Sequence, residues 1–461
     1  MIYLLKKRIL IFGLCPMVLF AITCVVQAGS NDTNNNRPNI ILILADDLGY
    51  ADLGVHGSPD IKSPRIDSLA KNGIRFTDGY VTSSQCGPSR AGLITGRYQN
   101  RFGFESNEQA HIPGIPVTEP IISERLRGAG YATGMMGKWG VANYHEGHPQ
   151  QRGFDTTFWN HNGNRLFHDV PTRHNPGIMV RHGNDKKDVL TEYSTDAFTR
   201  EAVKFITANK AKPFFLYLPY VTPHLPREAR PQDLARFSHV PDLRRRTTLA
   251  MMANLDDNIG WILDTLKAHD LTKNTLIFFI SDNGGADVIH DPANDNASFN
   301  HPLQGNKSTM FEGGIRVPFI VQWPAKFPAG TVYKAPVISL DIVATSLAAA
   351  GINKPKKPMP EGVNLIPYLT GVNEGSPHEA LYWRFNFPSL QPKHHSWAVR
   401  KGDWKLMKYK PWAKSKLFNL AEDIGEKHDL AEHNPAKVQQ LNKMWHQWDA
   451  KNIAPGIEGV R

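Results

Sequence analysis

Short, mostly apolar runs recur along most of the chain, and each run ends in a polar cluster. The four clearest runs are 39–44, 132–136, 214–218 and 276–280. Continuous apolar runs of this length predict strands buried on both faces, as in a parallel sheet. Stretches between them predict helices, at 123–128, 194–209 and 249–268. We therefore expect an α/β fold with a mostly parallel sheet flanked by helices.

The pattern changes near residues 352–378, where prolines and glycines interrupt it. Beyond this stretch, alternating segments predict a small antiparallel sheet, and residues 435–452 predict a closing helix. The alternating segments are 381–385, 397–399, 404–408 and 417–420. Six of the ten tryptophans lie in this part, and we expect them to pack the small domain on the large one rather than to stack on sugars. The predicted division is a large domain at 29–370 and a C-terminal α+β subdomain at 371–461.

The polar clusters follow the carboxyl ends of the predicted strands. In an open parallel sheet these ends share one edge, where ligands collect. Residues far apart in sequence are therefore expected to meet there: Asp46 and Asp47, Lys138, His224, Asp282 and Asn283.

The first 28 residues have the features of a secretory signal peptide. Three basic residues at 6–8 precede an apolar run at 9–26, and Ala28 offers a cleavage site. We expect cleavage after Ala28 and export to the periplasm or the medium. The alternative is an uncleaved membrane anchor, because the apolar run is near the lower length limit for spanning a bilayer.

The net charge of the chain favours negatively charged binding partners. Removing the signal lowers the formal net charge from +10 to +7. A basic exported protein suits polyanionic partners such as sulfated glycans. No nucleic-acid-binding motif accompanies this charge, so we expect no nucleic acid partner. No other stretch is long and apolar enough to span a bilayer, so no stable membrane insertion is expected after cleavage.

The chain has three cysteines, and two of them lie in the signal. Cys86 is then alone, so no internal disulfide can form. It lies in SQCGPSRAGLITG (84–96), which reads as a loop entering a helix with Pro88 in its first turn. Free backbone N–H groups at the helix start and the nearby Arg90 favour an anion at this position. The alternative is a small buried thiol.

This segment resembles the C-x-P-S-R…T-G signature of the formylglycine-dependent sulfatases, in which the cysteine is converted to formylglycine. The resemblance covers nearly the whole mature chain, through PNIILILADDLGY, LRGAGYATGMMGKW, ISDNGG, GNKSTMFEGGIRVPFIVQWP and LFNLAEDIGEKHDL. Within the alkaline phosphatase superfamily, the chain is similar to arylsulfatases and N-acetylgalactosamine-6-sulfatases. It is thus expected to be a sulfuric ester hydrolase with the alkaline phosphatase-like fold.

The resemblance implies one divalent cation at the sheet edge. Its ligands would be Asp46, Asp47, Asp282, Asn283 and the formylglycine made from Cys86. An all-oxygen set of this kind suits calcium, with magnesium as the alternative, better than zinc.

The resemblance also implies catalytic roles. One hydroxyl of the hydrated aldehyde attacks sulfur to give a covalent sulfo-enzyme, and the other then expels sulfate. Arg90 would orient the hydrate, Lys138 and Lys307 would neutralise charge on the transferring group, and His224 would carry a proton. The expected partners are a sulfated polysaccharide or oligosaccharide, such as ulvan, carrageenan or a glycosaminoglycan, and a formylglycine-generating or sulfatase-maturing enzyme.

One position departs from the family pattern. Sulfatases commonly have histidine directly after Lys-Trp, where this chain has Gly140. The following loop carries His145 and His148, and we hypothesise that one of them enters the site, with His145 favoured because it is nearer to Lys138. The alternative is that both are solvated loop histidines, which leaves His224 or His161 to be considered.

Two other functions stay open at this point. A phosphodiesterase or phosphonate hydrolase of the same superfamily would use the same kind of centre on phosphorus. A sulfated-glycan-binding protein without turnover is the other alternative, and Gly140 favours it.

Overall fold

A computed structural model describes residues 37–107, 114–142, 145–160, 179–182, 186–190, 192–286, 297–386, 395–410 and 412–453. The signal peptide predicted at 1–28 and the histidine at His161 lie outside these residues. Among the described helices, none is long and apolar enough to cross a membrane.

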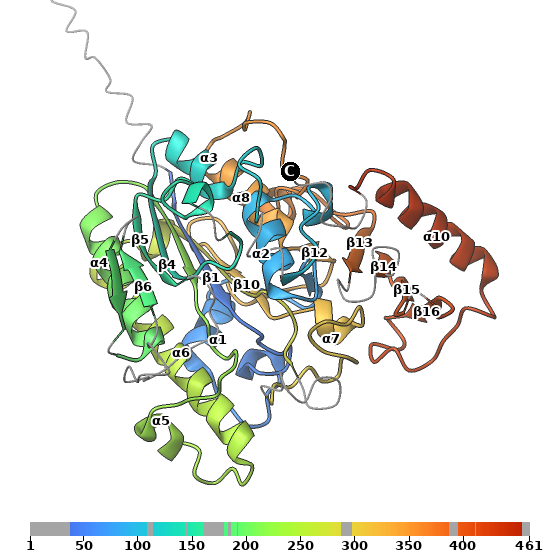
Figure 1. The fold of residues 1–461 in the computed structure, drawn as a ribbon, viewed down its shortest axis with the longest axis horizontal. Coiled ribbons are helices and arrows are strands. Elements are labelled where there is room, and N and C mark those ends of the chain that lie inside the picture. Colours follow the sequence, from blue (N-terminus) through green and yellow to red (C-terminus); the bar gives the residue numbers. More distant parts are fainter. Residues whose placement is uncertain are drawn as a thin grey trace, which may run out of the picture.

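A large central sheet with a parallel core runs through the described structure (Figure 1). Strand β1 (Asn39–Ala45) lies at its centre, with β8 (Phe214–Pro219) on one side and β9 (Thr275–Ser281) on the other, both parallel to it. Next to β8 come β4 (Ala132–Lys138) and β5 (Thr156–Asn160), also parallel. Every residue of β1, β8 and β9 is buried, which confirms the prediction made from the apolar runs.

Short strands extend this sheet at both sides. Beyond β9 lie β10 (Phe319–Gln322) and β2 (Ile74–Phe76), each antiparallel to its inner neighbour, and then β11 (Thr331–Tyr333). Beyond β5 lie the antiparallel strands β6 (Met179–His182) and β7 (Lys186–Val189). Strands of three or four residues leave too short a pattern to be predicted from sequence.

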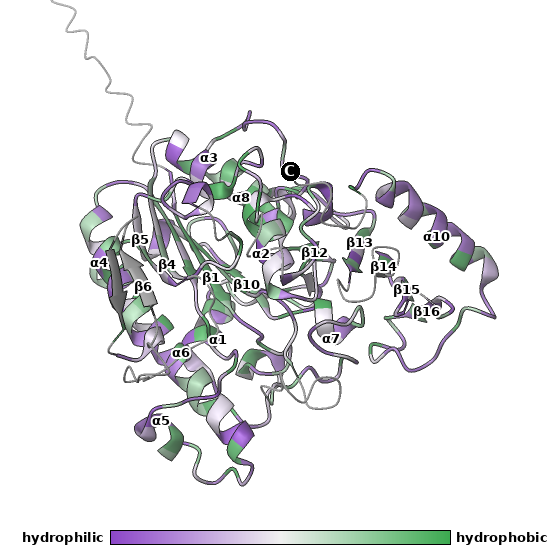
Figure 2. Ribbon diagram, viewed as in Figure 1, coloured by the Kyte–Doolittle hydropathy of each residue, from purple (hydrophilic) through white to green (hydrophobic). Residues whose placement is uncertain are grey.

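Helices cover both faces of the sheet, and alternate residues of β1 face the two layers. Ile41 and Ile43 belong to a core shared with α1 (Pro64–Lys71), α4 (Ser194–Asn209) and α6 (Leu243–Ala268). Ile40 and Leu42 belong to a second core, shared with α2 (Cys86–Thr95), α3 (Ile122–Gly128) and α8 (Leu340–Ala349). The central strands are accordingly hydrophobic in Figure 2. Helix α6 starts at Leu243, earlier than residue 249 as predicted.

The C-terminal part forms its own sheet at one side of the molecule (Figure 1). Its strands are β13 (Leu381–Asn386), β14 (His395–Lys401), β15 (Trp404–Lys408) and β16 (Lys416–Asn419), all antiparallel, and α10 (Pro435–Asp449) packs on β14 and β15. This confirms the predicted α+β unit. The remaining elements are short: β3 (Gly79–Tyr80), β12 (Val337–Ile338), α5 (Pro231–Ala235), α7 (Glu312–Ile315) and α9 (Ile366–Leu369).

Buried tryptophans pack the C-terminal part, and Trp383 joins it to the large domain, as predicted. The indole N–H of Trp383 donates to the carbonyl of Val81 at 2.7 Å, and that of Trp445 donates to the carbonyl of Trp383 at 3.0 Å. Trp412 does not follow the prediction, because it is 67% exposed.

A buried ion cluster makes a second connection between the two parts. The ammonium of Lys405, on β15, lies 2.8 Å from Glu312 and 2.9 Å from Glu426, and all three side chains are fully buried. Arg316 Nη1 also lies 3.3 Å from Glu312, so removal of the lysine would leave Glu312 with one cationic contact and would take the ammonium away from the buried Glu426.

Candidate active site

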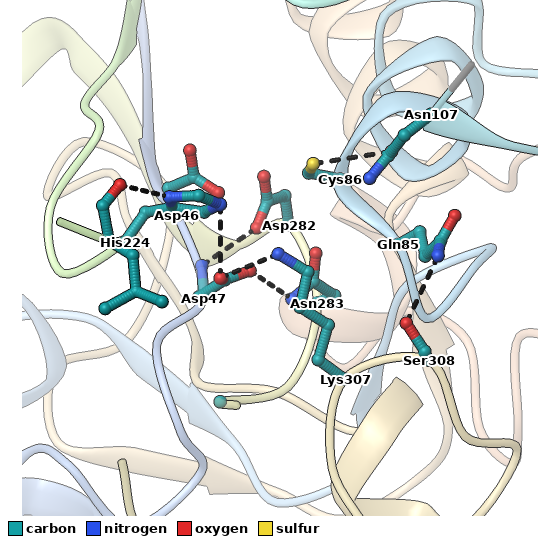
Figure 3. Close-up of polar contacts among 12 residues, drawn as sticks. Asp46, Asp47, Gln85, Cys86, Asn107, His224, Asp282, Asn283, Lys307 and Ser308 are labelled. Carbon is teal, nitrogen blue, oxygen red and sulfur yellow. Dashed lines mark hydrogen bonds and ion pairs between the residues drawn. The ribbon is translucent and has the colours of Figure 1, made fainter. Parts of the chain in front are cut away.

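Asp46 and Asp47 follow β1 directly, and both are buried. Successive side chains of a strand point to opposite faces. Asp47 breaks this alternation, because its φ of 63° places it in the left-handed region. Ala45 pairs with Ser281 in the parallel register of β1 and β9, so the residues after each strand lie side by side. The amide of Asp47 donates to Asp282 Oδ1 at 3.1 Å, and Asn283 Nδ2 donates to Asp47 Oδ1 at 2.7 Å (Figure 3).

Cys86 is the first residue of α2, and its thiol is buried. One ligand atom each of Asp46, Cys86 and Asp282 lie within 4.8 Å of one another. Three segments far apart in sequence therefore meet at the carboxyl edge of the sheet, and the residues predicted to be metal ligands are brought together.

The donor set at this edge fits a hard cation. Asp46 Oδ1 and Asn283 Oδ1 are buried and accept a hydrogen bond from no described residue. Buried acceptors without donors are costly unless something else binds them. Carboxylate and amide oxygens are the ligands of calcium and magnesium. Asp46, Asp47, Asp282 and Asn283 are therefore the residues that would hold such an ion.

Three cations surround the carboxylates. Lys138, the last residue of β4, lies with Nζ 2.6 Å from Asp46 Oδ2 and 3.8 Å from Cys86 Sγ. Arg90 Nε donates to Asp282 Oδ2 at 2.8 Å, and its Nη1 donates to the carbonyl of Lys138 at 3.0 Å. Lys307 Nζ lies 2.7 Å from Asp47 Oδ2. All three cations predicted from sequence are in place, and each contacts a carboxylate of the cluster.

Burial and charge shift the pKa values of the carboxylates in opposite directions. Burial alone would raise the pKa of Asp46, but the charges of Lys138, His224 and Arg90 hold it well below its ordinary value. Burial and the nearby charge of Asp46 raise the pKa of Asp282 to about 7. Two carboxylates confined together in a buried site behave in this way, and a divalent cation bound between them would favour the ionised form of both.

His224 lies in the loop after β8, where the sequence predicted it. Its Nε2 lies 3.5 Å from Asp47 Oδ2, and its Nδ1 lies 2.7 Å from the carbonyl oxygen of Leu225. Burial lowers the pKa of His224 below its ordinary value, even though Asp47 acts against this. A neutral ring whose Nδ1–H donates to Leu225 presents the lone pair of Nε2 to the cluster.

Gly140 lies beside the cluster, in the place where the family commonly has histidine. A Cβ built on it would lie 3.5 Å from Lys138 Cε and 3.7 Å from Arg90 Cδ. Its φ is +69°, in the left-handed region that favours glycine.

The structure does not bring His145 into this cluster. Its ring is exposed and contacts the ring of His148, with centroids 5.8 Å apart. His148 packs edge-on against Trp159. The indole N–H of Trp139 donates to the carbonyl of Gly147 at 2.9 Å and ties this turn to the end of β4. Among the described histidines, His224 contacts the cluster through Asp47, and a catalytic role for His145 stays a prediction.

The structure adds one residue that sequence patterns did not indicate. Asn107 Oδ1 lies 3.5 Å from Cys86 Sγ and accepts a hydrogen bond from the amide of Gly87 at 2.9 Å. Asn107 follows a stretch without regular hydrophobic spacing, so no local signal marks it.

Comparison with known proteins identifies the family. The sulfatase family model matches residues 38–352, the whole of the parallel sheet and its polar edge. The chain belongs to the sulfatase family. A second model, the C-terminal region of N-sulphoglucosamine sulphohydrolase, matches residues 304–452.

Similar proteins extend over nearly the full length of this sulfatase. Mouse N-acetylgalactosamine-6-sulfatase is 35% identical over 91% of the chain and 87% of its own length. N-acetylgalactosamine-6-O-sulfatase from Bacteroides thetaiotaomicron is 29% identical over 90% and 93%. The crystal structure of Ps i-CgsB in complex with k-i-k-neocarrahexaose has a TM-score of 0.83 and 35% identity, covering 91% of this chain and 94% of that one. The protein is thus a sulfuric ester hydrolase with the alkaline phosphatase-like fold, and the alternative of a binding protein without turnover is not supported.

Proposed function

We propose that this sulfatase hydrolyses a sulfate ester on a sulfated polysaccharide or oligosaccharide of the carrageenan, ulvan or glycosaminoglycan kind. One observation carries the proposal: the oxygens of Asp46 and Asp282 and the sulfur of Cys86 converge within 4.8 Å at the start of α2. The sugars named for the similar proteins, galactosamine sulfate and a carrageenan oligosaccharide, support a sulfated glycan as the substrate.

The proposal includes conversion of Cys86 to formylglycine and binding of one calcium or magnesium ion. In the structure, Cys86 Sγ stands where the hydroxyl oxygens of the hydrated formylglycine would lie. When bound, the ion and the hydrate would supply Lewis-acid stabilisation of the sulfate and a nucleophilic hydroxyl. Asp46, Asp47, Asp282 and Asn283 would hold the ion, because they carry the oxygen donors of the cluster.

The cationic side chains then have separate tasks. Lys138 Nζ, 3.8 Å from Cys86 Sγ, lies within reach of both the nucleophile and a sulfate oxygen. Lys307, on the far side of Asp47, neutralises charge that develops on the transferring sulfuryl group. Arg90 contacts Asp282 and the backbone of Lys138 together, so it fixes the position of one carboxylate relative to β4.

In this proposal, His224 donates a proton to the leaving group. Its Nδ1 is anchored on the carbonyl of Leu225, which fixes the ring and leaves Nε2 facing the cluster. A bound sulfate dianion or monoester adds negative charge beside the ring and favours its protonated form, so that Nε2 has a proton to give to the departing sugar oxygen.

The test is sulfate release from a panel of defined sulfated oligosaccharides. Protein produced with a maturing enzyme should release sulfate from at least one of them, and the same chain produced without the maturing enzyme is the matched control. Cys86→Ala should be inactive with the fold retained. Rapid turnover of an aryl phosphodiester without sulfate release from any sulfated glycan or aryl sulfate would contradict the proposal in favour of phosphorus chemistry.

We also propose that the protein is exported after cleavage at Ala28. The basic residues at 6–8 and the apolar run at 9–26 support this. N-terminal sequencing of protein from the native host should begin at Gly29, and an intact Met1 would contradict it.

A further inference from the structure

Asn107 reaches residue 86 from outside the sulfatase motif. Figure 3 shows its amide on one side of Cys86, with Asp46 and Asp282 on the other. The oxygen of this amide lies 3.5 Å from Cys86 Sγ. A second polar neighbour of the sulfur is Lys138 Nζ, at 3.8 Å. Residue 86 is therefore flanked by a hydrogen-bond donor, the ammonium, and by an acceptor, the amide oxygen.

The backbone fixes which atom of the amide faces residue 86. The N–H of Gly87 lies 2.9 Å from Asn107 Oδ1, and an N–H can only donate, so this atom of the side chain is the oxygen. A carbonyl oxygen has two lone pairs. One accepts from Gly87, and the other is free to accept a hydrogen from the side chain of residue 86.

Gly87 permits this approach because it has no side chain. A Cβ at this position would lie 3.0 Å from Asn107 Oδ1 and 3.3 Å from Phe104 Cε1. An alanine would therefore push the amide away by a few tenths of an ångström. The absence of a side chain at Gly87 therefore lets the Asn107 amide approach residue 86.

We propose that Asn107 is a positioning residue of the reaction, which accepts a hydrogen from one hydroxyl of the hydrated formylglycine at position 86, and that Gly87 admits it. This rests on the proposed function, because those hydroxyls exist only after conversion of Cys86. A thiol is a weak donor, whereas a hydroxyl makes a full hydrogen bond with an amide oxygen. Asn107 thus stabilises the hydrate relative to the aldehyde and turns the other hydroxyl toward the sulfate.

A purely structural role gives a different expectation. The N–H of Gly87 lies in the first turn of α2, where backbone N–H groups have no acceptor within the helix. Asn107 accepts its hydrogen bond and so caps the helix. A cap affects the stability of the helix but not the chemistry of residue 86. The two roles are therefore separated by measuring the state of residue 86 itself, not only turnover.

The test compares Asn107→Ala with the wild type after peptide mass spectrometry has shown equal conversion of Cys86. Loss of one hydrogen bond should lower kcat for an aryl sulfate by about fivefold to tenfold, with little change in KM. The native aldehyde should react with an aminooxy probe faster by about the same factor, because less of it is hydrated. Gly87→Ala should change both quantities in the same direction, and the double variant should be no worse than Asn107→Ala.

Gln85→Ala is the matched control, because Gln85 adjoins residue 86 but its amide bonds Ser308 Oγ at 3.2 Å (Figure 3). This variant should leave the labelling rate unchanged. A lower melting temperature of Asn107→Ala with unchanged labelling and kcat would overturn the inference and leave a cap. Equal labelling changes in Gln85→Ala would also overturn it. A wild type that carries only thiol after co-expression with the maturing enzyme, yet is fully active, would overturn the proposed function and this inference with it.

Discussion

Asp282→Asn tests the cation site with the smallest change of shape. Asp282 Oδ1 accepts from the amide of Asp47 at 3.1 Å, and Oδ2 accepts from Arg90 Nε at 2.8 Å. The asparagine keeps an oxygen for the first contact. Its NH2 group then faces Arg90 Nε–H, and two donors oppose each other. One negative charge is also removed from the donor set.

The structure sets the size of the effect. Loss of a residue that merely supports a metal ligand costs about 10–100-fold in metal affinity. Asp282 is itself a predicted ligand of the ion and also accepts a hydrogen bond from Arg90, so we expect calcium affinity to fall by at least about a hundredfold, or about 2.8 kcal/mol. Arg90 keeps a contact to Asp46, at 3.3 Å, so the fold is expected to persist.

The assay is a calcium titration of chelator-treated protein by calorimetry, with sulfate release measured on the same samples. Asp264→Asn is the matched control, because Asp264 is an exposed carboxylate paired with Arg65 at 3.2 Å. Chelation should inactivate the wild type, and calcium or magnesium should restore it. Calcium affinity of Asp282→Asn within a few-fold of the wild type would refute the assignment of this residue, and restoration by zinc alone would refute the oxygen-donor reasoning.

Three other expectations concern residues away from the cation site. Lys405→Ala removes the buried ammonium that both Glu312 and Glu426 contact, and it should cost about 3–5 kcal/mol in chemical denaturation. Lys401→Ala, at an exposed pair, should cost under about 1 kcal/mol, and equal losses would contradict this. Asp341 raises the pKa of the largely buried His378, against the effect of burial, so His378 stabilises the fold below its ordinary pKa and this stabilisation is lost as pH rises through the raised value. The melting temperature of the wild type should therefore exceed that of His378→Gln more at pH 6 than at pH 9, and a constant difference would contradict the ion pair. His145→Ala should change turnover only a few-fold, since its ring lies outside the cluster; a loss of about two to four orders of magnitude would restore the role predicted from sequence.

The order of apolar and polar residues predicted the central architecture and the meeting of most candidate site residues at one edge of the sheet. Runs such as 40–44 and 276–280 are apolar without interruption, which is typical of a strand covered on both faces, and their polar endings were expected to meet because parallel strands end at one edge. The register of β1 and β9 then placed Asp47 beside Asp282, as the pattern required. The strands and their polar ends could be predicted because the burial of a strand shows in its own run of apolar residues.

Contacts that depend on the path of the chain between elements could not be predicted from the sequence. Asn107 carries no periodic signal, and its contact with residue 86 exists because the chain after α2 folds back over the start of that helix. Arg245, near the start of α6, is buried in an ion pair with Asp52 at 2.7 Å, a partner that lies nearly two hundred residues earlier in the chain. The loop after β4 was expected to carry His145 to the site, but the contact of Trp139 with Gly147 holds it elsewhere. A long-range contact of this kind depends on the positions of two segments at once, and no property of either segment alone specifies it.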